Sequence, residues 1–206
     1  MLSAQTRSIA VERKNTIAVF GGMGVHMVSA SDVVNYINSV STFAQRVDDF
    51  GVAVDFFGGV EFPIDTEWGL KLEHSYLFKS YSFVEQTNGS TYEIFYATQS
   101  PSVIIQKVIV GKGYFVKFGA GGGYHFGMLT QKVSTFGTTT KYSTNSIGVK
   151  IEIVGQTAFD DNVYGYVGGS LGWERDINKF TMPNSSKPLS LNYFHAGIRF
   201  GMNYYF

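Results

Sequence analysis

Three polar residues near the C-terminus have the side-chain types that acyl transfer requires. His195 could serve as the base, Glu174 as the acid that orients it, and Ser170 as the nucleophile. A second interpretation involves no catalysis. Glu174 closes one predicted strand and His195 opens the next, so the two would form a hydrogen-bonded pair at one end of a sheet. We favour this structural pair and predict no catalytic residues.

The sequence gives weaker support for metal sites, disulfides and phosphate-binding loops. The chain has no cysteine, which excludes disulfides and thiolate metal sites. His26, His125 and His195 share a strand face with the charged residues, but nothing in the sequence indicates that they lie at one level. His74 falls on the opposite, apolar face. A phosphate-binding loop must be followed by a helix, and no predicted helix follows any of the glycine-rich stretches. We therefore predict no metal and no other cofactor.

The composition narrows the class of protein. Lys and Arg number 16 and Asp and Glu number 16, so the formal net charge is zero and no basic surface indicates nucleic-acid binding. Glycine (24), tyrosine (13) and phenylalanine (18) are abundant. No apolar run reaches the roughly 18 residues that a membrane-spanning helix needs.

Residues 193–206 alternate almost without error between two faces, which predicts a β-strand. One face is apolar throughout: Phe194, Ala196, Ile198, Phe200, Met202, Tyr204 and Phe206. The other face carries polar residues and small ones, and Arg199 lies in its middle.

Seven further segments alternate in the same way and predict strands. In 91–106 the apolar face begins with Tyr92, Ile94 and Tyr96, and the pattern slips near Pro101, where we expect a bulge or an edge-like break. The segments are 17–28, 50–62, 67–81, 91–106, 113–128, 146–159 and 163–175.

In these registers no charged residue falls on the apolar face. A Lys or Arg that faces lipid at the midplane costs roughly 2–4 kcal/mol, whereas a soluble barrel carries its charges outside. The pattern therefore predicts an all-β fold, an eight-stranded antiparallel up-and-down transmembrane β-barrel. The predicted inward charges are Asp55, Glu61, Glu67, Lys71, Glu73, Lys79, Glu93, Lys117, Lys150, Glu152, Glu174 and Arg199.

Short and long connections alternate, as in outer-membrane barrels. The long ones are 29–49, 82–91, 129–145 and 176–192, and the short ones lie near 63–66, 111–113 and 160–162. We expect residues 1–16 to form a periplasmic tail, which could include a signal-peptide remnant, and residues 17–206 to form the barrel. Aromatic residues gather at the short-turn rim (Phe62, Trp68, Tyr114, Phe159, Tyr204, Phe206) and at the loop rim (Phe78, Tyr92, Trp173, Phe194).

One long connection has a helical period. Residues 31–47 carry Val33, Ile37, Val40, Ala44 and Val47 at spacings of four and three, and Ser31 or Asp32 could cap a helix there. Such a helix could contact a partner, the bilayer or the barrel mouth. We favour the alternative of a long loop that folds over its own apolar side chains.

In strand pattern, loop pattern and aromatic terminus, residues 17–206 resemble the small eight-stranded outer-membrane barrels of the OmpA-transmembrane-domain and OmpX type. Phe206 resembles the terminal signal read by the barrel-assembly machinery. The resemblance implies a bacterial outer-membrane protein. Its implied partners are outer-membrane lipid, lipopolysaccharide, the assembly machinery and, through the loops, another envelope or surface protein.

Some barrels of this architecture are enzymes that act on lipid A, and this chain lacks the sequence features of two of them. The deacylase resembles a serine hydrolase with His and Ser two apart on one lipid-facing strand. Here His26, His125 and His195 are followed at that spacing by valine, glycine and glycine. The palmitoyl transferase begins with an amphipathic helix, and residues 1–15 lack a clear apolar face.

An eight-stranded barrel is just wide enough to be filled by its own side chains. We therefore expect a paired lumen network of Asp55, Glu61, Lys71, Glu73, Lys117, Lys150, Glu152 and Arg199. The leading function is a non-enzymatic, structural or surface-interaction role through the outer loops. The alternatives are a narrow channel for small solutes, a lipid-modifying enzyme, and a soluble ligand-binding barrel that the charge pattern disfavours.

Overall fold

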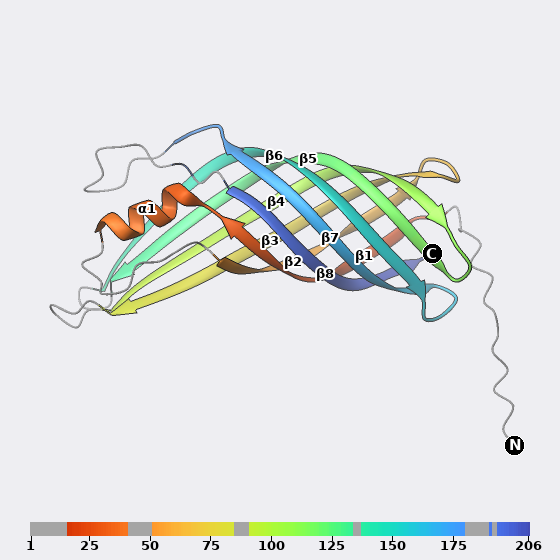
Figure 1. The fold of residues 1–206 in the computed structure, drawn as a ribbon, viewed down its shortest axis with the longest axis horizontal. Helices are drawn as coiled ribbons and strands as arrows, with labels where there is room; N and C mark the ends of the chain where they lie inside the picture. Colours follow the sequence, from red (N-terminus) through yellow and green to blue (C-terminus); the bar gives the residue numbers. More distant parts are fainter. Residues whose placement is uncertain (1–15, 41–50, 85–90, 134–136, 180–189, 191–192) are drawn as a thin grey trace, which may run out of the picture.

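The structure is a computed structural model, and it describes residues 16–40, 51–84, 91–133, 137–179, 190 and 193–206. These residues form eight strands and one helix (Figure 1). The elements are β1 (Ala18–Ser29), α1 (Ser31–Val40), β2 (Gly51–Pro63), β3 (Trp68–Val84), β4 (Thr91–Val110), β5 (Tyr114–Val133), β6 (Thr138–Ala158), β7 (Val163–Asp176) and β8 (Tyr193–Tyr205). Apart from Thr16, the predicted tail lies outside the described residues.

The strands close into a barrel. Each pairs antiparallel with its sequence neighbours, and β1 pairs with β8. Pairing followed from Ala18 around all eight strands returns to β1 at Val28, ten residues further along the chain. This stagger tilts the strands, and closure leaves no open edge. The predicted eight-stranded up-and-down barrel is confirmed.

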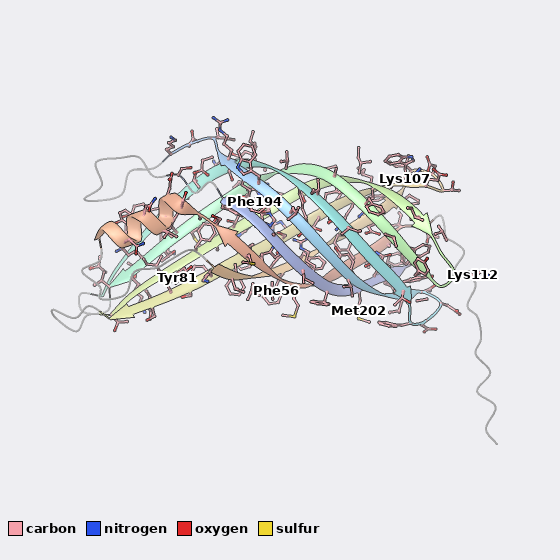
Figure 2. All side chains as sticks on the ribbon, in the orientation of Figure 1. Phe56, Tyr81, Lys107, Lys112, Phe194 and Met202 are labelled. Atoms are coloured by element: carbon pink, nitrogen blue, oxygen red, sulfur yellow. The ribbon has the colours of Figure 1, made fainter. Side chains whose placement is uncertain are left out.

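The outer wall is an apolar band. Figure 2 shows Phe56, Phe194 and Met202 projecting from the wall, and they are 48%, 48% and 53% exposed. Aromatic residues such as Trp68 and Trp173 are also exposed, at the short-turn and loop rims respectively. The predicted apolar faces of β1, β2, β3, β5, β6, β7 and β8 point outward, as expected. Among the described residues, no helix has the length and apolar character needed to cross a bilayer.

The faces of β4 were predicted wrongly. Ile94 and Tyr96 are buried inside the barrel, at 6% and 1% exposure. Glu93, predicted to point inward, lies outside and pairs with Lys132 of β5 at 3.3 Å. The reason is that this end of the β4–β5 hairpin extends beyond the apolar band. There the wall faces water, so apolar residues point inward and charges point outward.

Of the two features expected near Pro101, the bulge does not occur, and a break occurs only on the side that faces β5. Pro101 pairs with His74 of β3 in the same register that joins the ends of the two strands. The β4–β5 pairing likewise resumes in unchanged register at Ser102 and is interrupted only at residues 100 and 101. Proline lacks an N–H, so it removes a hydrogen bond from the ladder without shifting the strand.

A second charge was also misplaced. Glu67, predicted to point inward, lies in the exposed turn between β2 and β3 and pairs with Lys107. Lys107 projects from the outer wall, with its ammonium 5.0 Å from the ring centre of Trp68. An outward Lys at this height is tolerated because its long side chain reaches the rim, where an acid and an aromatic ring stabilise it.

The predicted loop 129–145 is mostly strand. β5 continues to Val133 and β6 starts at Thr138, with Val133 and Thr138 paired directly. Threonine is β-branched and favours strands, so this Thr-rich stretch extends a hairpin. Gly137, with φ of 61°, lies just before β6 in a conformation that glycine adopts without strain. The short turns occupy residues 64–67, 111–113 and 159–162, close to their predicted places.

Helix α1 lies at the barrel mouth, at the end opposite the C-terminus (Figure 1). Val33, Val34 and Tyr36 are buried against strand residues in one apolar cluster. Burial, together with Tyr142, raises the pKa of the Tyr36 phenol, so its hydroxyl stays protonated at neutral pH. The helix-at-the-mouth hypothesis is therefore correct for 31–40 and the favoured loop interpretation is wrong there. Residues 41–47 lie outside the described part.

The burial of Val33 generates a prediction about this helix. Val33→Asp places an unpaired carboxylate in the apolar cluster, which costs several kcal/mol. We expect α1 of this variant to be cleaved by protease at least about ten times faster, because about 1.4 kcal/mol already changes an equilibrium tenfold. Asn35→Asp, on the exposed face of the helix, is the matched control and should be cleaved at the wild-type rate. Equal rates for the two variants would contradict the docking.

Candidate functional site in the barrel lumen

The lumen is filled in layers between the short-turn end and the mouth. Nearest the turns, Lys117 binds the carboxylate of Glu61 and donates to the hydroxyl of Tyr205 at 3.0 Å. Asn203 donates to Glu61 at 3.3 Å, and the Tyr205 hydroxyl donates to Gln156 at 2.7 Å. Each of these hydrogen bonds joins different strands, so the layer also ties the wall together.

The middle layer is centred on Glu73. Its carboxylate lies 2.7 Å from Lys71 and 2.7 Å from the Arg199 guanidinium, and it also binds Lys150. Arg199 reaches a second acid, Asp55, at 2.6 Å, and Lys71 reaches Glu152 at 3.0 Å. A buried charge is costly without an opposite partner, and in this layer each charge has one.

Aromatic rings lie under the same bases. The Arg199 guanidinium lies 4.5 Å from the ring centre of Phe57, and the Lys71 ammonium lies 4.7 Å from that of Phe20. Together with Val154 and Tyr166 these rings form an apolar cluster. Ring faces attract cations, most strongly where water is excluded. The charges and the rings therefore fill the cross-section together.

The structure brings all eight predicted network residues together in the lumen, and each contacts an opposite charge. Four are acids and four are bases, so the network of eight residues is neutral when all are ionised. The pairs are Asp55 with Arg199, Glu61 with Lys117, Glu73 with Lys71, Lys150 and Arg199, and Glu152 with Lys71 and Lys150.

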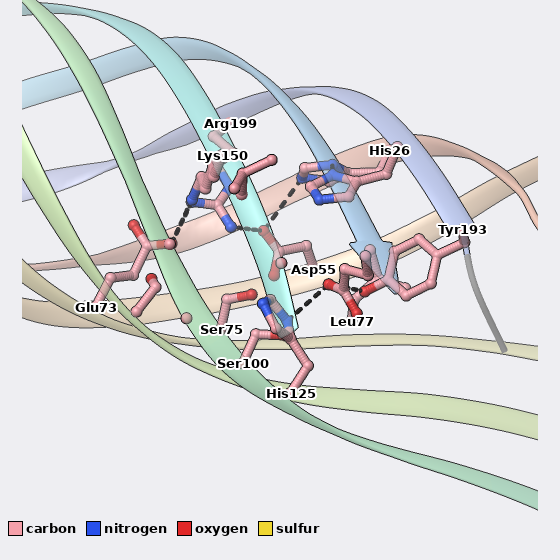
Figure 3. Close-up of a pocket in the computed structure, with 17 residues that line it drawn as sticks. His26, Asp55, Glu73, Ser75, Leu77, Ser100, His125, Lys150, Tyr193 and Arg199 are labelled. Carbon is pink, nitrogen blue, oxygen red and sulfur yellow. Dashed lines mark hydrogen bonds and ion pairs between the residues drawn. The ribbon is translucent and has the colours of Figure 1, made fainter. Parts of the chain in front are cut away.

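A histidine layer lies beside the charges, on the side toward the mouth; Figure 3 labels His26 and His125 of this layer. His26 contacts His195 through their Nδ1 atoms at 3.0 Å and Asp55 through Nε2 at 3.2 Å. His125 Nδ1 lies 2.7 Å from Glu174 Oε1 and 2.6 Å from Ser100 Oγ. A small cavity of about 20 Å³ lies among these side chains. That volume suits one or two water molecules rather than a substrate.

The predicted pairing of Glu174 with His195 is replaced by two other pairs. Glu174 binds His125 and the hydroxyl of Tyr193, while His195 binds His26. The reason is the stagger of the barrel, which brings residues of β1, β5, β7 and β8 to one level although their sequence positions do not indicate it. The sequence did contain one hint, the inward glycines. A Cβ at Gly197 would lie 2.5 Å from the His26 ring, and one at Gly172 would lie 2.1 Å from His195 Nε2.

The geometry does not assemble a hydrolase. In a triad the serine and the acid bind opposite nitrogens of the histidine, whereas Ser100 and Glu174 both approach Nδ1 of His125. Ser170, the nucleophile considered with His195, is buried, and its hydroxyl has no hydrogen-bond partner among the described residues. Within the described part of the chain, no group of three or more His, Asp or Glu side chains is placed to hold a metal ion.

The mouth closes the lumen above the histidines. Tyr193 and Tyr96 are nearly perpendicular, with ring centres 6.0 Å apart, and both pack in the apolar cluster that holds α1. At the other end of the barrel, the backbone N–H of Phe206 donates to the carbonyl of Ile17 at 3.2 Å, which fastens the last residue beside β1. The assembly-signal role of Phe206 stays a prediction.

Comparison with known proteins supports the fold. No protein-family model and no curated protein sequence matches the chain. Among solved structures, Neisserial surface protein A matches with a TM-score of 0.54 and 12% identity, covering 92% of this chain and 97% of that one. The attachment invasion locus protein Ail of Yersinia pestis, in complex with the heparin analogue sucrose octasulfate, matches with a TM-score of 0.51 and 14% identity, covering 94% and 100%. The chain therefore has the fold of small outer-membrane β-barrels.

The buried pair of Lys117 and Glu61 generates a prediction. Lys117→Met leaves Glu61 without its cation and should lower the free energy of unfolding by about 3–5 kcal/mol. Adding Glu61→Gln removes the stranded charge, so the double variant should recover at least about 1 kcal/mol. Urea unfolding in lipid vesicles measures both.

The exposed pair of Lys107 and Glu67 is the matched control. Lys107→Met, alone or with Glu67→Gln, should change the free energy of unfolding by less than about 1 kcal/mol, because solvent screens exposed ion pairs. Equal costs at the two pairs would show that the lumen layer is hydrated rather than packed.

Proposed function

We propose that this chain is a non-enzymatic protein of the bacterial outer membrane whose lumen is closed and whose function is surface interaction at the loop end. The observation that carries the proposal is the inverted distribution of side chains, with an apolar band outside and a paired ionic network inside. Only a bilayer stabilises such an exterior. The displaced catalytic geometry around His125 and His195 supports a function without catalysis.

The filled layers argue against conduction. The Glu73 layer spans the barrel from β2 and β3 to β6 and β8, because Arg199, Lys71 and Lys150 converge on one carboxylate. A passing solute would have to displace these bases from Glu73, Asp55 and Glu152. The aromatic cluster below and the apolar mouth above add two further barriers.

Charge at the loop end indicates the chemistry of a partner. Among the described residues, four basic ones project outward there, beyond the apolar band: Lys132, Lys141, Arg175 and Lys179. Arg175 follows Trp173, which lies at the loop rim, by two positions, so its guanidinium lies at the height of lipid headgroups. Glu93 offsets Lys132 in part. Outward cations at this height fit the phosphate groups of lipopolysaccharide.

The resemblance to Ail fits the same chemistry, because that protein was solved with a sulfated sugar analogue. In this chain the basic residues lie on the side of the β5–β6–β7 wall, so surrounding lipopolysaccharide can reach them. A structural role through lipopolysaccharide and a role in binding other anionic surface sugars would use the same side chains.

Lipopolysaccharide retention tests the proposed partner. We expect Lys141→Glu combined with Arg175→Glu to lower the affinity of the purified barrel for lipopolysaccharide about thirtyfold, since each of the two phosphate contacts contributes roughly 1 kcal/mol. Lys112→Glu, in the exposed turn at the opposite end, is the matched control and should retain the wild-type amount. Equal retention by all three proteins would remove lipopolysaccharide as the partner.

Conductance tests the closed lumen separately. In a planar bilayer the wild-type barrel should give no single-channel steps, because no layer leaves an aqueous path. Insertion is verified on the same sample by protection from protease. Regular steps from inserted wild-type protein would favour the narrow-channel alternative and contradict the closed lumen.

A further inference from the structure

A hollow in the outer wall lies where β2, β3, β4 and β5 meet. It is a shallow hollow of about 560 Å³ that is open to the outside of the barrel. Its floor consists of Gly58, Pro101 and Gly122, which carry little or no side chain, and its sides include Leu72 and Val103. A volume of this size lies within the range of small-molecule sites, roughly 300–1,000 Å³.

Two residues that line this hollow carry a polar group on the outer wall, His74 and Tyr124, and His74 is the one that lies beside Gly58 and Pro101. It pairs with Gly58 on one side and with Pro101 on the other, and since neither neighbour is bulky its ring stands exposed. On β3 it lies between Trp68 and Phe78, which were assigned to the two rims, so it faces the apolar part of the bilayer. An ionisable side chain at membrane depth is costly unless something satisfies it.

The wall behind the hollow is thin. Four residues line both the hollow and the histidine cavity of the lumen: Glu73, Ser102, Gly122 and Gly123. The β4–β5 pairing is interrupted here, at residues 100 and 101, where Pro101 has no N–H to donate. Here the barrel offers polar groups unusually close to lipid.

We infer that this hollow binds an alkyl chain that carries a hydroxyl group, with the chain along Leu72 and Val103 and the hydroxyl at His74. Size favours a chain over a second copy of this protein, since a hollow of about 560 Å³ is far smaller than the wall of an eight-stranded barrel. Depth favours a hydroxyl within the chain over a headgroup, because His74 lies between the rims. The inference rests on the proposed membrane location and adds a ligand class to it.

The contact between His74 and the hydroxyl must supply the selectivity for a hydroxylated chain over a plain one. Within a bilayer an alkyl chain gains little by moving from other chains to an apolar wall, because both surroundings are apolar. A hydroxyl, in contrast, finds no partner among lipid tails, and the exposed imidazole of His74 can donate to it or accept from it. A hydroxylated chain should therefore outcompete a plain one of equal length.

The test is competition between 12-hydroxystearate and stearate for the refolded barrel in detergent, with bound molecules counted by native mass spectrometry. The wild type should prefer the hydroxylated chain about three- to tenfold. His74→Leu should bring that ratio to about one while keeping one bound chain. Gly58→Leu should fill the floor and abolish the binding of both chains.

Gly21→Leu is the matched control, because Gly21 lies on the outer wall of β1 directly opposite Gly58 and outside the hollow. A Cβ at Gly21 meets only the carbonyl of Phe57, at 3.6 Å, so the variant should fold and bind as the wild type does. A wild-type ratio of one, equal loss in both glycine variants, or a dimer that Gly58→Leu dissociates would overturn the inference.

Every sample is first shown to be a closed barrel by its mobility in SDS before and after boiling. A closed barrel without the hydroxyl preference refutes the ligand alone. A chain that never forms a closed barrel refutes the membrane location on which the ligand depends.

Discussion

Hydrocarbon cannot hydrogen-bond to the peptide backbone, and the rest of this structure depends on that constraint. A sheet in such a solvent must close on itself, as β1 does with β8. Once it is closed, charged side chains at the level of the hydrocarbon core have only the lumen to occupy. The lumen of eight strands is narrow, so each charge must lie against an opposite one. The closed sheet, the inverted faces and the network around Glu73 all follow from the hydrocarbon that surrounds the barrel.

The same barrel passes from one solvent to another along its length. Within the apolar band the interior is ionic and the exterior is apolar. Beyond the loop rim the order reverses, with Ile94 and Tyr96 inside and Glu93 and Lys132 outside. Helix α1 is stable at this junction because the interior has become apolar there. The histidine layer lies at the boundary between the two interiors.

This reversal of the inner and outer faces limits what the sequence could predict. Alternation predicted the strands, because period two survives any register, and it predicted the inward charges wherever the strand lies in lipid. It failed at Ile94 and Tyr96, where one rule for the outer face was applied to a part of β4 that faces water. It also took the Thr-rich end of β6 for a loop. The partners of Glu174 and His195 depend on the ten-residue stagger, which no local pattern reports.

The proposed function and the proposed ligand both require that the chain forms a closed barrel with lipid outside. Gel mobility of the membrane fraction in SDS, unboiled against boiled, tests that claim most directly. A closed barrel resists SDS, so the unboiled protein should migrate as a compact species and shift to the position of the full 22.8 kDa chain on boiling. A single band in both lanes, with the protein in the soluble fraction, would contradict the account.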